Sequence, residues 1–316
     1  MKIISLEQIE SILPSLDLIP EIEKGFSDYS QGRVVVPPVG EMILDKGEVH
    51  IKYGFVKKDA FYVIKVASGF YGNPALGLSS GNGLMLLFSQ HTGELECILL
   101  DEGHLTNIRT AVAGAISARH MAPKNVRQIG IVGAGTQGKM QLIYLKRVIA
   151  CRKVLVWGLD DEELSSYKSE MEKEGFMVQS TREAAMILDQ CNLVVTATPS
   201  KFPLLFPRDL KPGTHITAVG SDTVEKQELD SGILQKADLV VADSIAQCME
   251  RGEIFKAMES GQLEKKDVVE LGQVISGTIP GRTHQDQITI ADLTGVAVQD
   301  INIAAAVYRA FTNRRL

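Results

Sequence analysis

Three glycines between a short apolar run and an amphipathic segment have the spacing of a phosphate-binding turn. Ile129 to Val132 has the composition of a buried strand, and Gly133, Gly135 and Gly138 follow it as G-x-G-x-x-G. In a strand-turn-helix unit, the first glycine permits the tight turn, the second lets the backbone approach a pyrophosphate, and the third lets helix and strand pack. The new helix then directs its N–H groups at the phosphates. The pattern predicts dinucleotide binding; a purely structural glycine-rich turn is the alternative.

The acid that commonly binds the ribose of NAD is missing from its usual place. Such folds put Asp or Glu at the end of the second strand, about 20 residues past the glycines. Here that position is Gly158, and no Arg or Lys follows at once to bind a 2′-phosphate. Asp160, two residues further on, is equally suited to bind the ribose or to cap the next helix. The predicted cofactor is therefore NAD or NADP, with no choice between them.

Two cationic residues precede the glycine-rich turn. Lys65 interrupts the apolar strand expected over 61–66, where a lysine either reaches water at a sheet edge or faces a site. Arg109 is expected in the first turn of a helix over 107–121, with Thr106 as the N-cap. A cation there opposes the helix dipole by roughly 0.3–1 kcal/mol, and a bound carboxylate would reverse that effect. The alternative for Arg109 is an exposed arginine paired with an acid.

Two further stretches follow expected strands at their carboxyl ends, where ligands of open parallel sheets bind. The first follows the strand expected over 193–197 and comprises Thr196, Ala197 and Thr198. It would lie near a nicotinamide, or form a simple turn. Asp222 follows the strand expected over 215–219 and would lie in the binding crevice, or cap a helix beginning near Glu225.

Composition excludes several classes of function. The 316 residues suggest two domains, and 45% hydrophobic with 23% charged residues is typical of a globular protein. A net charge of −6 without a basic run argues against nucleic-acid binding. The four cysteines are far apart, so neither disulfides nor a metal site is expected. No secretory signal and no run of about 18 apolar residues occurs, so we expect no membrane partner and a cytoplasmic location.

The pattern of apolar residues changes along the chain. Helical spacing covers 6–30 with a break at Pro14, and strands expected over 49–53, 61–66, 84–88 and 96–100 indicate a mostly antiparallel sheet. From residue 129 strands and helices alternate, which favours a parallel sheet. Its expected strands are 129–132, 154–157, 193–197, 215–219 and 239–241, with helices such as 162–174 and 225–235. After Gly281 the pattern changes again, to a strand expected over 288–290 and a long helix over 296–311.

Taken in order, these residues resemble the ornithine cyclodeaminase/mu-crystallin family over nearly the whole chain. The stretches that carry the resemblance are Lys65, 105–111 (LTNIRTA), 131–137 (IVGAGTQ), 218–222 (AVGSD) with Lys226 and Glu228, and 287–295 (QITIADLTG). The resemblance implies an α/β fold with a central Rossmann-type parallel-sheet domain and a discontinuous α+β domain. We therefore expect a dinucleotide-binding domain over 121–292, and a substrate-binding and dimerisation domain over 1–120 plus 293–316. A homodimer is implied.

The resemblance also assigns roles by position. Lys65 and Arg109 are similar to the family's ligands for the substrate carboxylate, Asp222 to its acid/base, and Ser80 to a threonine that faces substrate or nicotinamide. Lys65 is also expected to take part in catalysis. The residues expected to bind the cofactor are Arg109, Thr110, Gly133, Gly135, Thr136, Gln137, Gly138, Asp160, Thr196, Ala197, Thr198, Val219, Gly220 and Ser221.

Two departures from the family pattern bear on the reaction. The arginine that usually follows the early proline is absent after Pro38, and Lys52 stands where the cyclodeaminases have a glutamate. A lysine could supply the missing positive charge, but it could not accept a hydrogen bond from a substrate ammonium. This favours an NAD(P)H-dependent reductase of a cyclic imino acid, Δ1-pyrroline-2-carboxylate to L-proline. The alternatives are an ornithine cyclodeaminase with catalytic NAD+, and a mu-crystallin-like protein that binds NADPH and a ligand without turnover.

Overall fold

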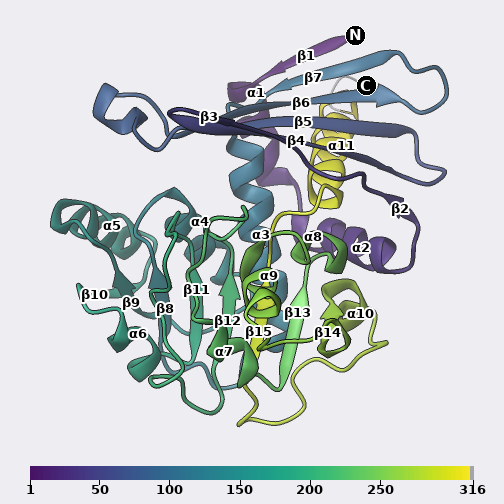
Figure 1. Cartoon of the computed structure of the whole chain (residues 1–316). Coiled ribbons are helices and arrows are strands. Elements are labelled where there is room, and N and C mark those ends of the chain that lie inside the picture. Colours follow the sequence, from purple (N-terminus) through teal and green to yellow (C-terminus); the bar gives the residue numbers. More distant parts are fainter. Residues whose placement is uncertain (314–316) are drawn as a thin grey trace. The chain divides into compact units, whose positions relative to one another are not determined.

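The structure, a computed structural model, describes residues 1–313 and divides the chain into two compact units (Figure 1). Met1–Arg109 and the segment from Val296 onward form what we call the discontinuous unit, and Thr110–Gly295 forms the central unit. The first division falls inside helix α3 (His104–Met121), in its second turn, whereas we expected it after residue 120. The helix therefore contributes residues to both units.

The discontinuous unit is built on a seven-stranded sheet. Its order is β1 (Lys2–Ser5), β7 (Leu95–Leu100), β6 (Gly81–Ser89), β5 (Phe61–Gly69), β4 (Gly47–Val56) and β2 (Val34–Val35), with β3 (Gly40–Leu44) also paired to β4. Only the β1–β7 pair is parallel. The expected mostly antiparallel sheet is confirmed, and β1 is an addition that four residues were too few to reveal.

Helices cover one face of this sheet. They are α1 (Leu6–Ile12), α2 (Leu18–Ser30) and α11 (Val298–Asn313), with a short 3₁₀ turn at Leu13–Ser15 where Pro14 was expected to break the helix. Because side chains alternate along a strand, one face of the sheet carries the fully buried Val63, Met85 and Leu87. Helix α11 packs against α2 and against β4, β5 and β6. The carboxyl-terminal segment thus closes the core of the amino-terminal sheet.

The central unit contains an eight-stranded sheet whose strands are all parallel. The order is β10 (Met177–Thr181), β9 (Lys153–Trp157), β8 (Ile129–Val132), β11 (Leu193–Thr196), β12 (His215–Ala218), β15 (Thr289–Asp292), β13 (Leu239–Ala242) and β14 (Val268–Glu270). Up to β12 this is the Rossmann order, in which the order of the strands reverses between β8 and β11, and β15 takes the place of the sixth strand. Dinucleotides bind at this switch point, so the predicted fold class is confirmed.

Helices alternate with these strands. They are α4 (Thr136–Leu145), α5 (Asp161–Lys173), α6 (Ala185–Gln190), α7 (Ser231–Gln235), α8 (Ile245–Cys248), α9 (Gly252–Glu259) and α10 (Leu271–Ile275). The helix expected over 225–235 is wrong in its first half, because Gln227 N–H donates to the Ser200 carbonyl and Leu205 pairs with Leu229. Asp230 caps the short α7 instead.

The start of α3 also differs from the expectation. Thr106 lies within the helix rather than at its N-cap, since α3 begins at His104. Asp101 provides the acceptor for this end: its Oδ2 lies 2.9 Å from the Leu105 amide nitrogen. Arg109 is consequently in the second turn, where the opposition of the helix dipole is weaker than expected. None of the helices within residues 1–313 is both long and apolar enough to span a membrane.

Candidate functional site

Three cationic side chains gather in the discontinuous unit. Lys52 on β4 and Lys65 on β5 are direct cross-strand partners, so both point to the helix-covered face of the sheet. Arg109 comes from α3. Their exposed fractions are 5%, 1% and 5% respectively. Lys65 is thus not an edge lysine that reaches water, and Arg109 is not an exposed arginine, although it is paired with an acid.

That acid is Asp300 on α11, which the sequence did not single out. A single oxygen, Oδ1, accepts from Lys65 Nζ at 3.1 Å and from Arg109 Nε at 3.0 Å. Arg109 Nη1 also donates to the side-chain oxygen of Gln299 at 3.3 Å. The other oxygen, Oδ2, is buried and makes no hydrogen bond within residues 1–313. Asp300 therefore fixes both predicted carboxylate ligands at once.

Electrostatics show how tightly these charges are coupled. Burial and the positive charge of Arg109 lower the pKa of Lys65 to about 7, and the opposing effect of Asp300 is not enough to restore it. Burial disfavours ionisation of Asp300, but Arg109, Lys65 and Lys52 together hold the pKa of Asp300 below its usual value. The carboxylate is thus ionised at neutral pH, and Lys65 is near its titration point. Three cationic side chains thus lie close to the ionised Asp300, and Asp101 is also within electrostatic range of Lys65.

The glycine-rich turn in the central unit has the geometry that its sequence predicts. Gly133 has φ +108°, a conformation that favours glycine, and a Cβ at Gly138 would come within 2.0 Å of the Gly133 carbonyl oxygen. A Cβ at Gly133 would lie 2.8 Å from the Ala197 oxygen. The turn after β8 is therefore in contact with the end of β11. Helix α4 begins at Thr136, directly after the turn.

The ends of β11 and β12 are joined by Glu228, a fully buried residue. Its carboxylate accepts hydrogen bonds from Thr196, the last residue of β11, from Thr198 just beyond it, and from Gly220 after β12. Burial raises the pKa of Glu228 to about 7, even though these hydrogen bonds favour its ionised form. Three of the stretches expected to bind the cofactor, at 133–138, 196–198 and 219–221, are thus brought together at the switch point.

Asp222 forms an ion pair that the sequence did not predict. Its Oδ1 lies 2.8 Å from Nζ of Lys226, which is buried, and the Asp222 side chain is 35% exposed. The interpretation of Asp222 as a cap for a helix near Glu225 is wrong, because no helix begins there. Ser221 Oγ donates to the Lys226 carbonyl and so fixes the same loop.

Asp160 caps helix α5, since its side chain accepts from the Glu163 amide at 2.8 Å. The first turn of α5 is acidic, with Asp161, Glu162 and Glu163, and Arg182 pairs with Asp161 at 2.9 Å. The carboxylate of Glu163 also lies close to Gly135, 3.8 Å from where a Cβ would be. A role for Asp160 at the ribose stays a prediction.

The remaining predicted residues have local roles in the structure. Thr110 offers its carbonyl oxygen to Gln141 Nε2 on α4, at 3.0 Å. Val219 N–H donates to the Thr196 carbonyl, and Gln137 lies in the first turn of α4. Ser80 precedes β6, and its carbonyl accepts from Phe70 N–H at 2.7 Å. Their contacts with substrate or cofactor stay predictions.

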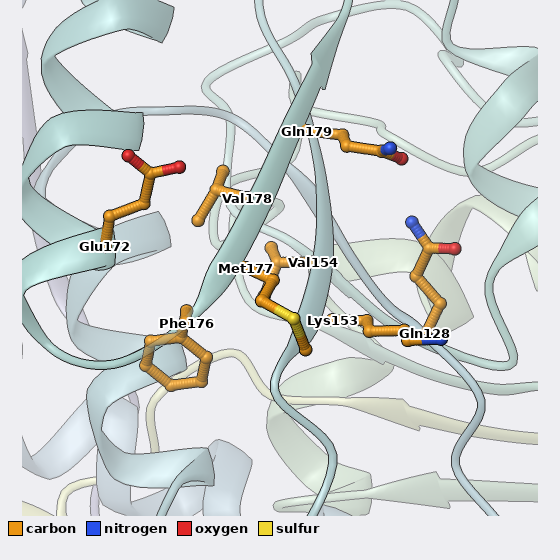
Figure 2. A pocket seen from close by; sticks show the side chains of 8 residues that line it. All are labelled: Gln128, Lys153, Val154, Glu172, Phe176, Met177, Val178 and Gln179. Carbon is orange, nitrogen blue, oxygen red and sulfur yellow. The ribbon is translucent and has the colours of Figure 1, made fainter.

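A cavity of about 680 Å³ lies elsewhere in the central unit. Figure 2 shows Glu172 and Phe176 on one side of β10 and Gln128 on the other. Gln128 precedes β8, and the other lining residues include the first residues of β9 and β10. These are the amino ends of the strands, whereas ligands of such sheets bind beyond the carboxyl ends. We do not assign the cofactor to this cavity. Within residues 1–313, no group of His, Cys, Asp or Glu is arranged to hold a metal ion.

Comparison with known proteins adds the following findings. The model of the ornithine cyclodeaminase/mu-crystallin family matches residues 1–314. An uncharacterized cyclodeaminase of Sinorhizobium fredii is 36% identical over 99% of this chain and 97% of its own. The alanine dehydrogenase of Archaeoglobus fulgidus is 34% identical over 97% and 94%. A Δ1-pyrroline-2-carboxylate reductase of Bacillus cereus is 30% identical over 79% and 78%.

Solved structures are similar over almost the entire chain. An archaeal alanine dehydrogenase dimer with bound NAD has a TM-score of 0.90 at 31% identity, covering 99% of this chain and 97% of that one. The iminosuccinate reductase of Paracoccus denitrificans in complex with NAD+ has a TM-score of 0.87 at 28% identity, covering 99% and 96%. Both neighbours bind the cofactor that the glycine-rich turn predicts.

Proposed function

Because this chain belongs to the ornithine cyclodeaminase/mu-crystallin family, we propose that it is an NAD(P)H-dependent reductase of an α-imino acid. Δ1-Pyrroline-2-carboxylate, reduced at its imine carbon to L-proline, is the substrate we favour. The relatives named as alanine dehydrogenase and pyrroline-2-carboxylate reductase support this reaction class. The observation that carries the proposal is the buried group of Lys52, Lys65 and Arg109 around Asp300, because cationic N–H donors of this kind suit a substrate carboxylate.

Each residue has a stated part in this reaction. Arg109 and Lys65, helped by Lys52, would bind the carboxylate and so fix the imine carbon. Asp222 would hydrogen-bond the imine nitrogen and keep it protonated, which makes the carbon a better hydride acceptor. Proton transfer by a positioned group contributes roughly 10²–10⁴-fold. The nicotinamide, when bound, supplies the hydride.

We further propose that NADH is preferred to NADPH. The turn that follows β9 carries Asp160 and an acidic first turn of α5, and the Glu163 carboxylate lies near Gly135. Two cations of this region are already paired, Arg182 with Asp161 and Lys139 with Glu170. A 2′-phosphate would therefore meet negative charge, whereas ribose hydroxyls can donate to carboxylates. The NAD bound in two of the similar structures supports the same choice.

We also propose a homodimer formed through the second face of the discontinuous unit's sheet. Apolar side chains continue across that face from strand to strand, as in the cross-strand pairs Tyr53–Ile64 and Ile64–Leu86 and the stacked rings of Tyr62 and Phe88. Tyr53 is 37% exposed. Contiguous, partly exposed apolar surface of this kind is typical of an interface, and light scattering should give the mass of two chains.

One experiment tests the proposed reaction. Purified protein is incubated with NADH or NADPH and a panel of cyclic and linear imino acids, and, separately, with L-ornithine and NAD+. Stoichiometric NADH consumption with Δ1-pyrroline-2-carboxylate supports the proposal. Proline and ammonia formed from ornithine, with no net change in NADH, would instead identify a cyclodeaminase. Cofactor binding without any turnover would identify a ligand-binding protein like mu-crystallin.

The pH dependence tests the role of Lys65. We expect kcat/KM for the imino acid to fall as the pH rises above about 7, because a neutral Lys65 no longer attracts a carboxylate. The stability should move in the opposite direction. The pKa of Lys65 is lowered from 10.5, so between about 7 and 10.5 the unfolded chain binds more protons and the free energy of unfolding increases with pH.

Lys65→Arg is the control for this effect, since arginine stays charged throughout this range. In the variant the fall in kcat/KM above neutral pH should disappear, even if the rate is lower overall. The same fall in wild type and variant would show that another group, such as the substrate nitrogen, is titrating.

A further inference from the structure

We infer that Glu228 is a positioning residue for the nicotinamide half of the cofactor site. Its single carboxylate is hydrogen-bonded both to the end of β11 and to the loop that follows β12, and so fixes the two relative to each other. This inference rests on the proposed binding of NADH at the switch point between β8 and β11. It concerns a residue that would not need to touch the cofactor itself.

The hydrogen bonds of Glu228 divide evenly between its two oxygens. Oε1 accepts from the amide and the hydroxyl of Thr198, at 2.6 and 2.7 Å. Oε2 accepts from the hydroxyl of Thr196 at 2.7 Å and from the Gly220 amide at 3.0 Å. Each oxygen thus holds one backbone N–H that cannot rotate away. A carboxylate suits this place because it can accept at every position.

The two loops are also in close contact with each other. A Cβ at Gly220 would lie 2.3 Å from the Thr198 carbonyl oxygen and 2.6 Å from Glu228 Oε2. The loops therefore meet over the carboxylate with no space for a side chain between them. A change at Glu228 would move both loops, because they share the same acceptor.

The backbone of Glu228 is itself fixed by a second buried acid. The carboxylate of Glu253 accepts from the amides of Glu228 and Leu229, at 2.7 and 3.2 Å. Asp292, at the end of β15, accepts from the Ile254 amide at 2.8 Å and so holds the start of α9. The position of Glu228 is thus set by the core strand β15 through α9.

The place of Glu228 in the sheet indicates which half of the dinucleotide it serves. Strands β9 and β10 lie on one side of β8, and β11 and β12 lie on the other. In a Rossmann sheet the ribose of the adenosine is held after the second strand, here β9, and the other mononucleotide half lies across the switch point. The Glu228 carboxylate accepts its hydrogen bonds from residues of that second half, at the ends of β11 and β12.

Glu228→Gln tests the inference through two ligands, NADH and ADP, measured by calorimetry. In glutamine one oxygen is replaced by an NH₂ group, which would face the amide of Thr198 or Gly220, donor against donor. We expect the dissociation constant for NADH to rise by about tenfold or more. Affinity for ADP, which lacks the nicotinamide half, should stay within about twofold of wild type. ADP would bind in the half of the site next to β9, on the other side of β8 from the loops that Glu228 holds.

Asp230→Ala is the matched control. Asp230 lies two residues further along the chain, and its side chain caps α7 through the Gly232 amide at 2.9 Å. Its backbone amide donates to the Leu205 carbonyl, a bond that alanine keeps. Loss of the side-chain cap should lower the melting temperature while leaving the affinities for NADH and ADP unchanged. Loss of stability alone then does not account for the effect at Glu228.

Either of two results with Glu228→Gln would overturn the inference. One is an unchanged affinity for NADH, and the other is an equal loss of NADH and ADP binding in a variant that is folded. If Glu228→Gln does not fold, Thr196→Val removes one of the same hydrogen bonds without changing the side-chain shape, and unchanged NADH affinity there would contradict the inference. A wild-type protein that binds neither ligand would overturn the proposed function, and this inference with it.

Discussion

Asp300→Asn is expected to lower kcat/KM for the imino acid by about 100-fold or more and the free energy of unfolding by about 3–5 kcal/mol. The variant removes the carboxylate that both Lys65 and Arg109 bind, at 3.1 and 3.0 Å. Two buried cations then lose their shared partner. Removing one partner of a buried ion pair lowers the free energy of unfolding strongly, because the charge that remains is buried without a counter-ion. Steady-state kinetics and urea unfolding measure the two effects.

The same unit offers a matched control in Asp28→Asn. Asp28 is buried and bridges a lysine and an arginine, Lys24 and Arg33, as Asp300 does. Its two partners are exposed, with side chains 69% and 52% accessible, so water can solvate their charges when the carboxylate is lost. We expect a smaller loss of stability and unchanged kinetics. If Asp300→Asn were as mild as Asp28→Asn, the buried cluster would not be what positions the substrate.

Asp222→Asn should lower kcat by about 10²–10⁴-fold while leaving NADH affinity nearly unchanged. The amide keeps the shape of the side chain but can neither hold nor release a proton at the imine nitrogen. Pre-steady-state hydride transfer, followed by NADH absorbance, separates this effect from product release. Normal turnover in the variant would remove Asp222 from the chemistry.

Asp189→Asn is the control for that variant. Asp189 also pairs with a lysine, Lys211, at 2.6 Å, but it lies on α6 with a side chain 62% exposed. Removing this surface pair should change neither kcat nor NADH affinity. A comparable loss of kcat in both variants would point to a general effect of charge.

The parts of this protein that were predictable from sequence are those set by neighbouring residues. The turn at Gly133 and Gly138 follows from a buried strand and a fixed glycine spacing, and both signals lie within ten residues. The alternation of strands and helices likewise gave the parallel sheet. In contrast, the loop at 225–230 has the composition of a helix but pairs with a distant segment, so tertiary contacts overrode local propensity.

Asp300 shows why half of the candidate site could not be predicted. Its partners Lys65 and Arg109 are 235 and 191 residues away in sequence, and no local pattern joins them. One signal was available. Asp300 has helical spacing with the buried apolar residues Ala304 and Val307, and an acid on the apolar face of a helix indicates a buried charge that needs a partner. Glu228 was similar, because an acid in a loop does not reveal which amides it binds.

The order of strands in the central sheet constrains how the chain can be made. Strand β15 lies between β12 and β13, although it is synthesised after both of them. Until residue 292 has left the ribosome, the edges of β12 and β13 that pair with β15 have no partner strand. Unpaired edges of this kind are open to association with other chains. The nascent protein therefore has its greatest exposure to misassembly late in translation, when most of its length is already outside the tunnel.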